Sequence, residues 1–382
     1  MHNAAINLLN LLNLSNTEKY ITDKVLNNQR ITPEEGLFLY EHASLTFLSV
    51  LANYIREKIN KNYVFFNRNI HIEPTNYCIY NCKYCSYARK IHNKDGWEYS
   101  IEQIEQIVKQ YKNSQITEIH ITGGVHPYRD LFYYAEMISR IKAILPNVHI
   151  KAFTAIEIDY MCRKAKVSYE QGLKILKESG LNSMPGGGAE ILDPEISKLI
   201  HDKPGPELWL HIHKIAHQLG IPSNATMMYG HLEKYHHRIN HLCKLRELQD
   251  QTSGFNAFIP LKFRNKNNQL SYLNEVSVIE DMRNYAVSRI MLDNIPHIKA
   301  YWVNIGKKNA QTALAFGVDD LDGTIDDTTK IYTMAGSQEQ HPRMTASEMI
   351  ELISAAGRIP VERDSVYNIL KIYYPENINN VA

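Results

Sequence analysis

Three cysteines lie close together in the first quarter of this 382-residue chain. Cys78, Cys82 and Cys85 have the spacing C-x3-C-x2-C within the string EPTNYCIYNCKYCSY. A disulfide needs two cysteines, and a structural zinc ion usually takes four protein ligands. Three thiolates on one short loop can instead hold a four-iron, four-sulfur (4Fe-4S) cluster and leave one iron without a protein ligand. The spacing therefore predicts an iron–sulfur site with one open iron.

An open iron can be chelated by the amino and carboxylate groups of a free amino acid, and the methionine part of S-adenosylmethionine carries both. An electron passed to the sulfonium then breaks a C–S bond and releases a 5′-deoxyadenosyl radical. The aromatic Tyr84 directly before Cys85 resembles the radical S-adenosylmethionine pattern, and we assign Tyr84 to cofactor binding. The alternative is that the three cysteines are buried packing residues, or that they bind zinc with a fourth ligand from elsewhere, such as His92.

Glycine-containing segments follow at the ends of later predicted strands. In radical S-adenosylmethionine enzymes, which the cysteine pattern resembles, a glycine pair such as Gly123 and Gly124 binds the amino group of the methionine part. Glu190 in MPGGGAE could bond the ribose hydroxyls, and Gly230 and His231 follow another strand in MMYGHLE. His231 could act as acid or base, bind a carboxylate, or be structural. A phosphate loop or an esterase would need motifs that the sequence lacks.

The elements that must position these residues alternate between strand-like and helix-like runs from about residue 70 onward. Strands are predicted over 70–74, 118–122, 148–154, 181–184, 223–229, 257–261, 298–303 and 314–320. Helices are predicted over 100–113, 130–145, 168–180, 206–220, 236–250, 277–292, 306–316 and 345–360. About eight unbroken repeats predict the α/β class, as a (β/α) TIM-type barrel of the radical S-adenosylmethionine kind. A doubly wound open sheet is the alternative.

The chain is expected to form one catalytic domain with flanking additions. Residues 1–69 are predicted to be a helical lead-in packed on the barrel, with its clearest helix over 39–60. Residues 70–330 are the predicted barrel core, and residues 331–382 a C-terminal extension.

The composition is that of an ordinary globular protein, with 44% hydrophobic residues, 22% charged residues and a formal net charge of +1. This balance gives no reason to expect nucleic acid or a membrane surface as a partner. No apolar run approaches the roughly 20 residues that span a bilayer. Five cysteines, three of them clustered, fit a reducing compartment. We expect a cytoplasmic enzyme.

Several other residues are predicted to have structural roles. His213 and His217 have the i,i+4 spacing of a helical metal site, but without the glutamate of H-E-x-x-H they are predicted to lie on a solvated face. The acidic run DDLDGTIDD over 319–327 lacks the EF-hand register and is predicted to be the turn after the last strand. Cys162 and Cys243 are expected to be packing residues.

A closer resemblance is carried by segments spread over nearly the whole chain, namely IEPTNYCIYNCKYCSYARK, HITGGVHP, MPGGGAEIL, MMYGHLE, FIPLKF, LDNIPHIKAYW and FGVDDLDGTI. They resemble the aminofutalosine synthases, radical S-adenosylmethionine enzymes of the futalosine route to menaquinone. Cyclic dehypoxanthine futalosine synthases and the radical enzymes of deazaflavin assembly share several of these motifs. They tend to carry serine in place of Tyr301, so the HIKAYW segment favours the aminofutalosine family. Thr333 departs from the resemblance, because histidine is expected there.

The resemblance implies a reaction with S-adenosylmethionine as cosubstrate and a low-potential electron donor, such as flavodoxin or ferredoxin, as partner. The 5′-deoxyadenosyl radical adds to 3-[(1-carboxyvinyl)oxy]benzoate, and rearrangement with loss of one carboxyl group gives 6-amino-6-deoxyfutalosine. A closed barrel lined by apolar and aromatic residues is expected to exclude water. A cyclase of the dehypoxanthine futalosine type, or a non-catalytic iron–sulfur or zinc protein, are the alternatives.

The two carboxylates of this substrate need cationic or hydrogen-bonding anchors. From their positions near strand ends, we expect these anchors among His231, Arg289 and His297. Asn294 and Tyr301 are expected near the same barrel mouth.

Overall fold

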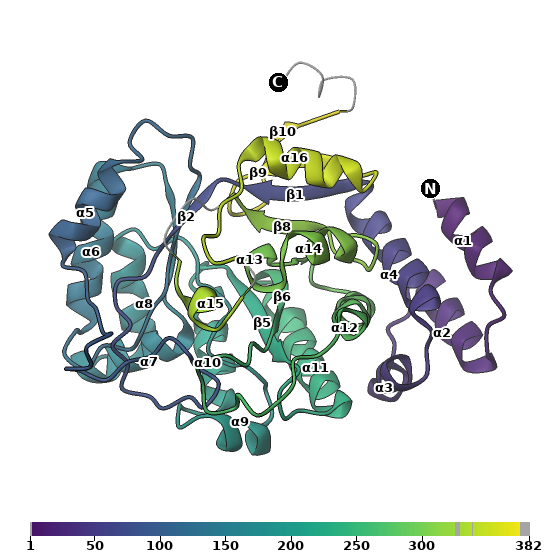
Figure 1. Cartoon of the computed structure of the whole chain (residues 1–382), viewed down its shortest axis with the longest axis horizontal. Helices are drawn as coiled ribbons and strands as arrows, with labels where there is room; N and C mark the ends of the chain where they lie inside the picture. Colours follow the sequence, from purple (N-terminus) through teal and green to yellow (C-terminus); the bar gives the residue numbers. More distant parts are fainter. Residues whose placement is uncertain (1, 325–328, 338, 375–382) are drawn as a thin grey trace.

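The computed structural model of the protein describes residues 2–324, 329–337 and 339–374. It begins with four helices on one side of the molecule (Figure 1), namely α1 (His2–Leu11), α2 (Asn16–Leu26), α3 (Pro33–Glu41) and α4 (Leu45–Asn60). The prediction of one helix over 39–60 is wrong. The chain breaks between α3 and α4 because the hydroxyl of Ser44 accepts the N–H of Phe47 and caps a new helix.

The strands of the described residues form three sheets. The first has the order β10–β9–β1–β8, with β1 (Tyr63–Asn67), β8 (Asp320–Gly323), β9 (Ile359–Arg363) and β10 (Ile369–Ile372). The second has the order β2–β3–β4, with β2 (Asn69–Ile72), β3 (Glu118–Ile121) and β4 (His149–Ala152). The third has the order β5–β6–β7, with β5 (Ser223–Tyr229), β6 (Phe255–Lys262) and β7 (His297–Ile298). Every pairing is parallel except that of β9 with β10.

Short contacts relate these sheets to one another. Isolated bridges join Lys151 to Ser183, Met184 to Ser223, and Lys299 to Asp320. The predicted strand over 181–184 therefore exists only as bridges. The predicted strand over 314–320 is wrong, because the chain first completes a helix and the strand starts at Asp320. The acidic run predicted to be a turn contains this strand, and its residues 325–327 lie outside the described part.

Helices follow most strands and cover the sheets (Figure 1). They are α5 (Ile101–Lys109), α6 (Leu131–Ile144), α7 (Ala155–Ala165), α8 (Tyr169–Glu178), α9 (Pro194–Ile200), α10 (Pro206–Gln218), α11 (Tyr235–Thr252), α12 (Val278–Met291), α13 (Trp302–Ile305), α14 (Lys307–Ala313), α15 (Ile331–Met334) and α16 (Ala346–Ala355). All eight helices predicted after residue 69 are confirmed, whereas α7, α9, α13 and α15 lie outside the predicted helix ranges. Helices α3 and α4 pack against α12.

Side chains alternate along the strands in a way that separates core from site. Ile70 and Ile72 of β2 belong to the hydrophobic core, whereas His71 between them lines a cavity. Ile119 and Ile121 of β3 are likewise core residues, and His120 lines the same cavity. Because successive side chains of a strand point to opposite faces, the helices cover one face and the other is free for polar groups.

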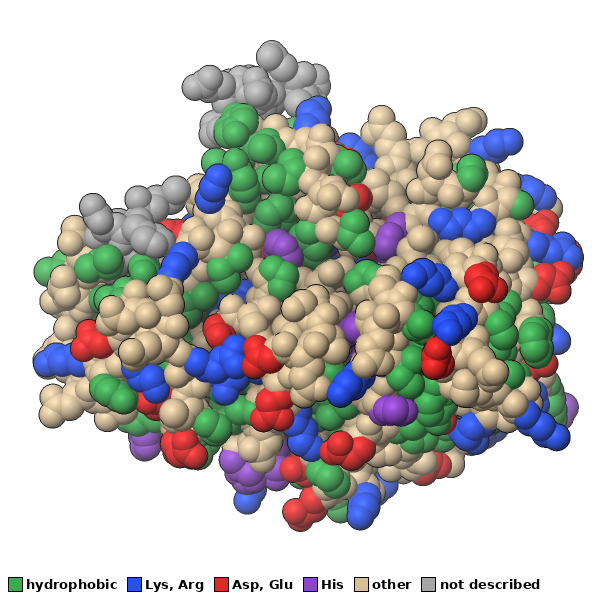
Figure 2. All heavy atoms as spheres, turned by 180° about the vertical axis from the view of Figure 1, so that it is seen from behind, with side chains coloured by type: hydrophobic (Ala, Val, Ile, Leu, Met, Phe, Trp, Pro, Cys, Tyr) green, Lys and Arg blue, Asp and Glu red, His purple; other side chains and the backbone are tan. Residues whose placement is uncertain are grey.

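The exterior carries charges of both signs. Figure 2 shows acidic and basic side chains mixed over one face of the molecule, in keeping with the formal net charge of +1. Among the described helices, none is both long enough and apolar enough to cross a bilayer.

Candidate functional site

The cysteine loop follows the carboxyl end of β2. One lysine holds its backbone, because the ammonium group of Lys90 donates to the carbonyl oxygens of Cys78, Ile79 and Tyr80 at 3.1, 2.7 and 3.1 Å. Such an ammonium group has three donors, so these three carbonyls use its full capacity. Lys90 therefore fixes the first half of the loop from outside.

The three thiols share one environment. Cys78, Cys82 and Cys85 are each half-buried. Burial raises the pKa of Cys82 to about 12, although the ammonium group of Lys203 opposes this, and burial also raises the pKa of Cys85. The charge of Cys85 acts on Cys82, and that of Cys78 on Cys85, so the thiols lie within electrostatic reach of one another. Thiols of this kind lose their protons when they bind metal.

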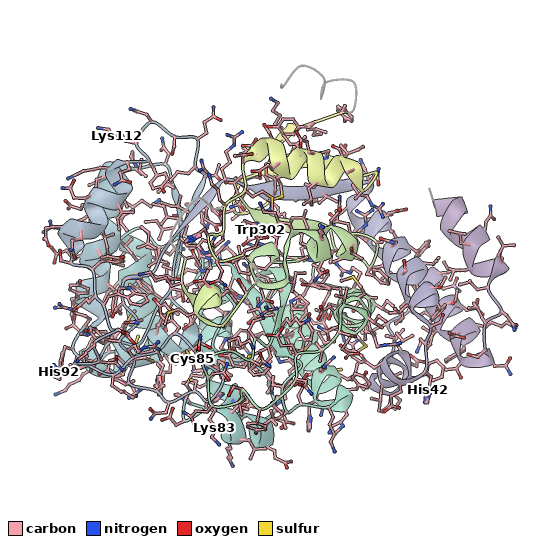
Figure 3. The ribbon with its side chains drawn as sticks, in the orientation of Figure 1. His42, Lys83, Cys85, His92, Lys112 and Trp302 are labelled. Atoms are coloured by element: carbon pink, nitrogen blue, oxygen red, sulfur yellow. The ribbon has the colours of Figure 1, made fainter. Side chains whose placement is uncertain are left out.

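The thiols do not converge on a single point. Among the described residues, no three His, Cys, Asp or Glu side chains are close enough to share one metal ion. A 4Fe-4S cluster differs from a single ion, because each thiolate binds a different iron. His92 lies at the edge of the molecule, away from Cys85 (Figure 3), and its side chain is exposed.

The glycine pair packs against the start of the cysteine loop. The N–H of Gly124 donates to the carbonyl oxygen of Thr75 at 2.8 Å. A Cβ atom at Gly124 would overlap the carbonyl of Tyr77, and one at Gly123 would lie 2.7 Å from the carbonyl oxygen of Thr75. The pair is therefore needed for close approach of two backbone segments. Neither glycine lines the cavity described next.

A cavity of about 290 Å³ lies at the carboxyl ends of the strands. Parallel strands present these ends at one edge, which is where ligands of α/β proteins usually bind. Its lining begins at the cysteine loop and includes residues from β2, β3, β5, β6 and β8 and from segments between the strands and helices, namely Tyr84, Cys85, His71, Glu73, His120, Gly186, Gly187, Gly188, Glu190, Asn224, Thr226, Ile259, Lys262, Arg264, Tyr301, Asp322 and Tyr332.

Tyr84, Glu190 and Lys203 form a buried cluster at the cysteine end of this cavity. The hydroxyl of Tyr84 and the ammonium group of Lys203 both donate to Glu190 Oε1, each at 2.5 Å. Burial alone would raise the pKa of Glu190, but the charge and hydrogen bond of Lys203 lower it, so the carboxylate is ionised. The sequence analysis missed Lys203, whose only signal was a lysine directly before the proline that leads into α10.

Other parts of the cavity lining carry aromatic and ionised groups. Tyr301 and His71 stack with ring centroids 6.2 Å apart, and His71 and His120 lie 4.6 Å apart. Burial lowers the pKa of His120 to about 3, so its imidazole is neutral. Burial would raise the pKa of Asp322, but the ammonium group of Lys299, 2.6 Å away, helps to lower it to about 2. Apolar and aromatic residues such as Met228, Leu261 and Phe263 line the cavity as expected, and strand residues add buried charges in pairs.

A segment of the C-terminal region covers the cavity. Thr329, Ile331 and Tyr332 are among its lining residues. The carboxylate of Glu73 accepts the N–H groups of Lys330 and Ile331 at 3.0 to 3.2 Å. On the other side, Arg264 donates to the carbonyl of Gly336 at 2.7 Å. We call residues 329–337 the strap.

Three expected substrate residues do not reach the cavity. Arg289 is fully buried and donates to the carbonyl oxygens of Leu292 and Ile295. Asn294 bonds Asp250 at 2.7 Å. His297 lies 2.5 Å from Asp319. The expectation that Arg289, Asn294 and His297 stand at the mouth is wrong.

The physical reason is the direction of β7. All three residues precede the end of that short strand, so they lie at its amino end, whereas Tyr301 follows it and lines the cavity.

His231 and Gly230 are also absent from the cavity lining. The ring of His231 is buried, with Nε2 3.2 Å from the carbonyl oxygen of Met228 and 3.4 Å from a carboxylate oxygen of Glu233. The N–H of Gly230 donates to the same carboxylate at 2.6 Å. These contacts indicate a structural role for His231, which is one of the three roles considered from the sequence. Instead, the cations that line the cavity are Lys262 and Arg264, which end and follow β6.

His213 and His217 are wrongly predicted as a solvated face. His213 is fully buried, and both rings lie 2.8 Å from the hydroxyl of Ser223, which joins α10 to β5. Cys162 is a buried packing residue as predicted, and Cys243 is half-buried.

Comparisons with known proteins place this geometry in a family. Residues 72–245 match the model of the Radical SAM superfamily, and residues 252–377 match that of the CofH/MqnC C-terminal region. The first match contains all three clustered cysteines, and the second contains the strap.

Curated relatives cover nearly the whole chain. An aminodeoxyfutalosine synthase of Thermus thermophilus is 40% identical over 92% of this chain and 96% of its own. A 5-amino-6-(D-ribitylamino)uracil–L-tyrosine 4-hydroxyphenyl transferase of Methanocaldococcus jannaschii is 37% identical over 90% of this chain and 98% of its own. A cyclic dehypoxanthine futalosine synthase of Streptomyces coelicolor is 36% identical, with coverages of 92% and 89%.

Solved structures agree on the fold. Methylornithine synthase (PylB) superposes with a TM-score of 0.72 at 18% identity, covering 89% of this chain and 97% of its own. The hydrogenase maturase HydG gives a TM-score of 0.72 at 17% identity, with coverages of 94% and 79%. The chain thus has an α/β fold like that of PylB and HydG.

The Radical SAM match implies a 4Fe-4S cluster on Cys78, Cys82 and Cys85, and S-adenosylmethionine beside it. The residues fit these groups, because three neighbouring thiols stand on one loop and the cavity extends from Cys85 to the ionised Glu190. The family matches and the relatives together show that this chain is a radical S-adenosylmethionine enzyme of the CofH/MqnC family.

Proposed function

We propose that the protein is an aminodeoxyfutalosine synthase of menaquinone biosynthesis. It would join the 5′-deoxyadenosyl group of S-adenosylmethionine to 3-[(1-carboxyvinyl)oxy]benzoate and give 6-amino-6-deoxyfutalosine. The observation that carries this proposal is the position of Tyr301, which lines the cavity. At this position the relatives of the aminofutalosine enzymes, which the sequence resembles, tend to carry serine. The 40% and 38% identities to two aminodeoxyfutalosine synthases support the same choice.

A 4Fe-4S cluster held by Cys78, Cys82 and Cys85 would supply the electron that cleaves S-adenosylmethionine. In our proposal the carboxylate of Glu190 accepts hydrogen bonds from the ribose of S-adenosylmethionine, and the hydroxyl of Tyr84 orients this carboxylate. Tyr301, His71 and His120 hold the arene, since their rings lie together in the cavity.

The substrate is a dianion, and its carboxylates need cationic partners. Two cationic side chains line the cavity: Lys262, the last residue of β6, and Arg264, which follows that strand. We assign the binding of the carboxylates to them. Lys262 already lies 2.9 Å from Asp281 and Arg264 lies 3.0 Å from Glu275. These acidic partners hold the cations in place at the edge of the cavity.

The proposal extends to the whole molecule. We propose that β2 to β8 form one closed (β/α) barrel over about 70–330, because bridges relate the sheets to which these strands belong. Residues 1–69 would be its lead-in, which contains strand β1 as well as the predicted helices, and residues 331–382, with β9 and β10, would be its C-terminal extension. We also propose a cytoplasmic enzyme that receives electrons from a flavodoxin or ferredoxin.

The test is an anaerobic assay of the reconstituted enzyme with reductant, S-adenosylmethionine and 3-[(1-carboxyvinyl)oxy]benzoate, with products identified by mass spectrometry. An adenosyl–benzoate adduct that has lost one carboxyl group supports the proposal. Free 5′-deoxyadenosine with untouched benzoate contradicts it and favours a cyclase-like substrate. Cys82→Ala should abolish the adduct, whereas the matched variant Cys243→Ala, in α11, should retain it.

A further inference from the structure

We propose that Lys203 is a positioning residue that aims the carboxylate of Glu190 at the ribose of S-adenosylmethionine and ties it to the cysteine loop. The proposal rests on the ribose role of Glu190 given above. It adds a residue outside the cysteine and glycine motifs, and it concerns binding of the cosubstrate rather than the identity of the second substrate.

The hydrogen bonds of Lys203 show that it acts through other groups. Its ammonium group donates to Glu190 Oε1 at 2.5 Å, to the Tyr84 hydroxyl at 2.7 Å and to the carbonyl oxygen of Gly188 at 2.9 Å. An ammonium group has three protons, so all its donors are used within the protein. The Lys203 side chain is only 6% exposed. It therefore has no donor left for a ligand.

The carboxylate of Glu190, by contrast, is used on one side only. Tyr84 and Lys203 both bind Oε1, and no described residue donates a hydrogen bond to Oε2. Glu190 lines the cavity and is held there in a left-handed backbone conformation with φ 55°. A non-glycine residue in that conformation is strained, and such residues often serve as ligand clamps. A carboxylate fixed through one oxygen presents the other to a hydroxyl donor.

Lys203 also joins three separate segments. Tyr84 stands between Cys82 and Cys85, Gly188 belongs to the glycine loop, and Lys203 itself lies between α9 and α10. Its three bonds hold the cysteine loop and the glycine loop at a fixed separation. Loss of Lys203 should therefore misplace Glu190 relative to the cysteine loop without removing any group that touches the ligand.

The test measures S-adenosylmethionine binding to the anaerobically reconstituted full-length enzyme, together with iron content and thermal unfolding. Lys203→Met should weaken binding about 10- to 100-fold, as expected for loss of hydrogen bonds to a charged group. Lys203→Arg should recover part of the affinity. The matched control is Lys151→Met, which breaks an equally buried pair with Glu118 at 2.7 Å outside the cavity lining. It should lower stability but leave affinity unchanged.

A double-mutant cycle separates positioning from general damage. In a Glu190→Gln background, Lys203→Met should change affinity little further, because its route of action is gone. The proposal would be overturned if the two substitutions reduced the affinity for S-adenosylmethionine independently, so that their fold-changes multiplied. It would also be overturned if a folded, iron-loaded Lys203→Met variant kept the wild-type affinity. If Lys203→Met fails to fold, Lys203→Arg decides: an affinity loss that disappears with 2′-deoxy-S-adenosylmethionine supports the proposal, and an equal loss with both ligands overturns it. No benzoate is present, so this result is independent of the proposed overall reaction.

Discussion

Glu157 is a buried carboxyl group in the first turn of α7. Its carboxylate caps the start of α7 by accepting the N–H of Thr154 at 2.7 Å. Burial is the largest influence and raises its pKa from 4.5 to about 7, although hydrogen bonds from Thr154 and Gly123 oppose the shift. The folded protein therefore keeps this proton at pH values where the unfolded chain has lost it.

The consequence is a pH-dependent stability. Because the folded-state pKa is the higher one, the contribution of Glu157 is fully present below pH 4.5 and is lost as the pH rises through about 7. The size is on the order of 3 kcal/mol, from about 1.4 kcal/mol for each unit of pKa difference. Glu157→Gln keeps the shape and removes the titration, so its stability relative to wild type should increase between pH 4.5 and 7.5. Urea denaturation at several pH values measures this, and parallel profiles would contradict it.

Gly124 offers a test of the close approach beside the cysteine loop. Gly124→Ser places a Cβ atom against the carbonyl of Tyr77, which is backbone and cannot turn away. We expect a loss of about 1–3 kcal/mol in unfolding free energy, as for other overpacked sites, and a lower iron content. The control is Gly205→Ser, where a Cβ meets nothing within 4 Å and serine suits a helix N-cap. Equal stability and iron loading in both variants would show that the glycine pair has no packing role.

For single residues, the sequence predicted those that belong to short motifs, but it did not predict which distant groups form hydrogen bonds or ion pairs with one another. Cys85, Tyr84 and Glu190 could be found because each sits in a short motif, and all three line the cavity. Lys203 and Arg264 could not, because their importance depends on which distant carbonyls and carboxylates they meet. Those partners are 13 to 119 residues away for Lys203 and 11 to 72 residues away for Arg264.

Elements set the limits of the prediction in a different way. Helices were found because their hydrophobic period is local, but β7 contains only His297 and Ile298. A strand predicted over 298–303 was thus too long, since α13 begins at Trp302. With the strand misplaced, residues at its amino end were assigned to its carboxyl end. The hydrophobic period alone cannot give the end of β7, because pairing with β6 decides where this strand stops.

The strap is the element whose behaviour can be tested directly. Glu73 fastens its first residues, and the ammonium group of Lys330 lies 4.3 Å from the ring centroid of Trp97. Glu73→Gln removes the charge from these bonds, which are worth about 1.5–3 kcal/mol when the acceptor is ionised. Hydrogen–deuterium exchange over 329–337 should become at least about tenfold faster. The control is Glu105→Gln on α5, which affects ion pairs with Lys109 and with Arg140 of α6, away from the strap. Unchanged exchange in Glu73→Gln would contradict this function of the carboxylate.

Over the whole molecule, the interior charges are arranged in pairs across segments that are distant in sequence. Lys151 pairs with Glu118 at 2.7 Å and Lys299 with Asp322 at 2.6 Å. Arg363 of β9 pairs with Asp320 of β8 at 2.6 Å. The last pair joins the C-terminal region to the sheet that carries β1. The two family matches, which divide the chain near residue 250, are connected through the third sheet, because β5 of the first match pairs with β6 of the second.

This arrangement predicts that the C-terminal region unfolds together with the rest of the chain. Arg363 and Asp320 are both buried, so Arg363→Met leaves a buried carboxylate whose nearest cation is Lys299 at 3.9 Å. Breaking such a pair costs about 3–5 kcal/mol. Urea denaturation should show one transition at a lower midpoint, coincident by tryptophan fluorescence and circular dichroism. Adding Asp320→Asn should restore part of the loss, because no unpaired charge then remains. If the main transition were unchanged and only the C-terminal residues became sensitive to protease, this region would be a separate folding unit. Because β9 and β10 share a sheet with β1 and β8, we expect one cooperative transition instead.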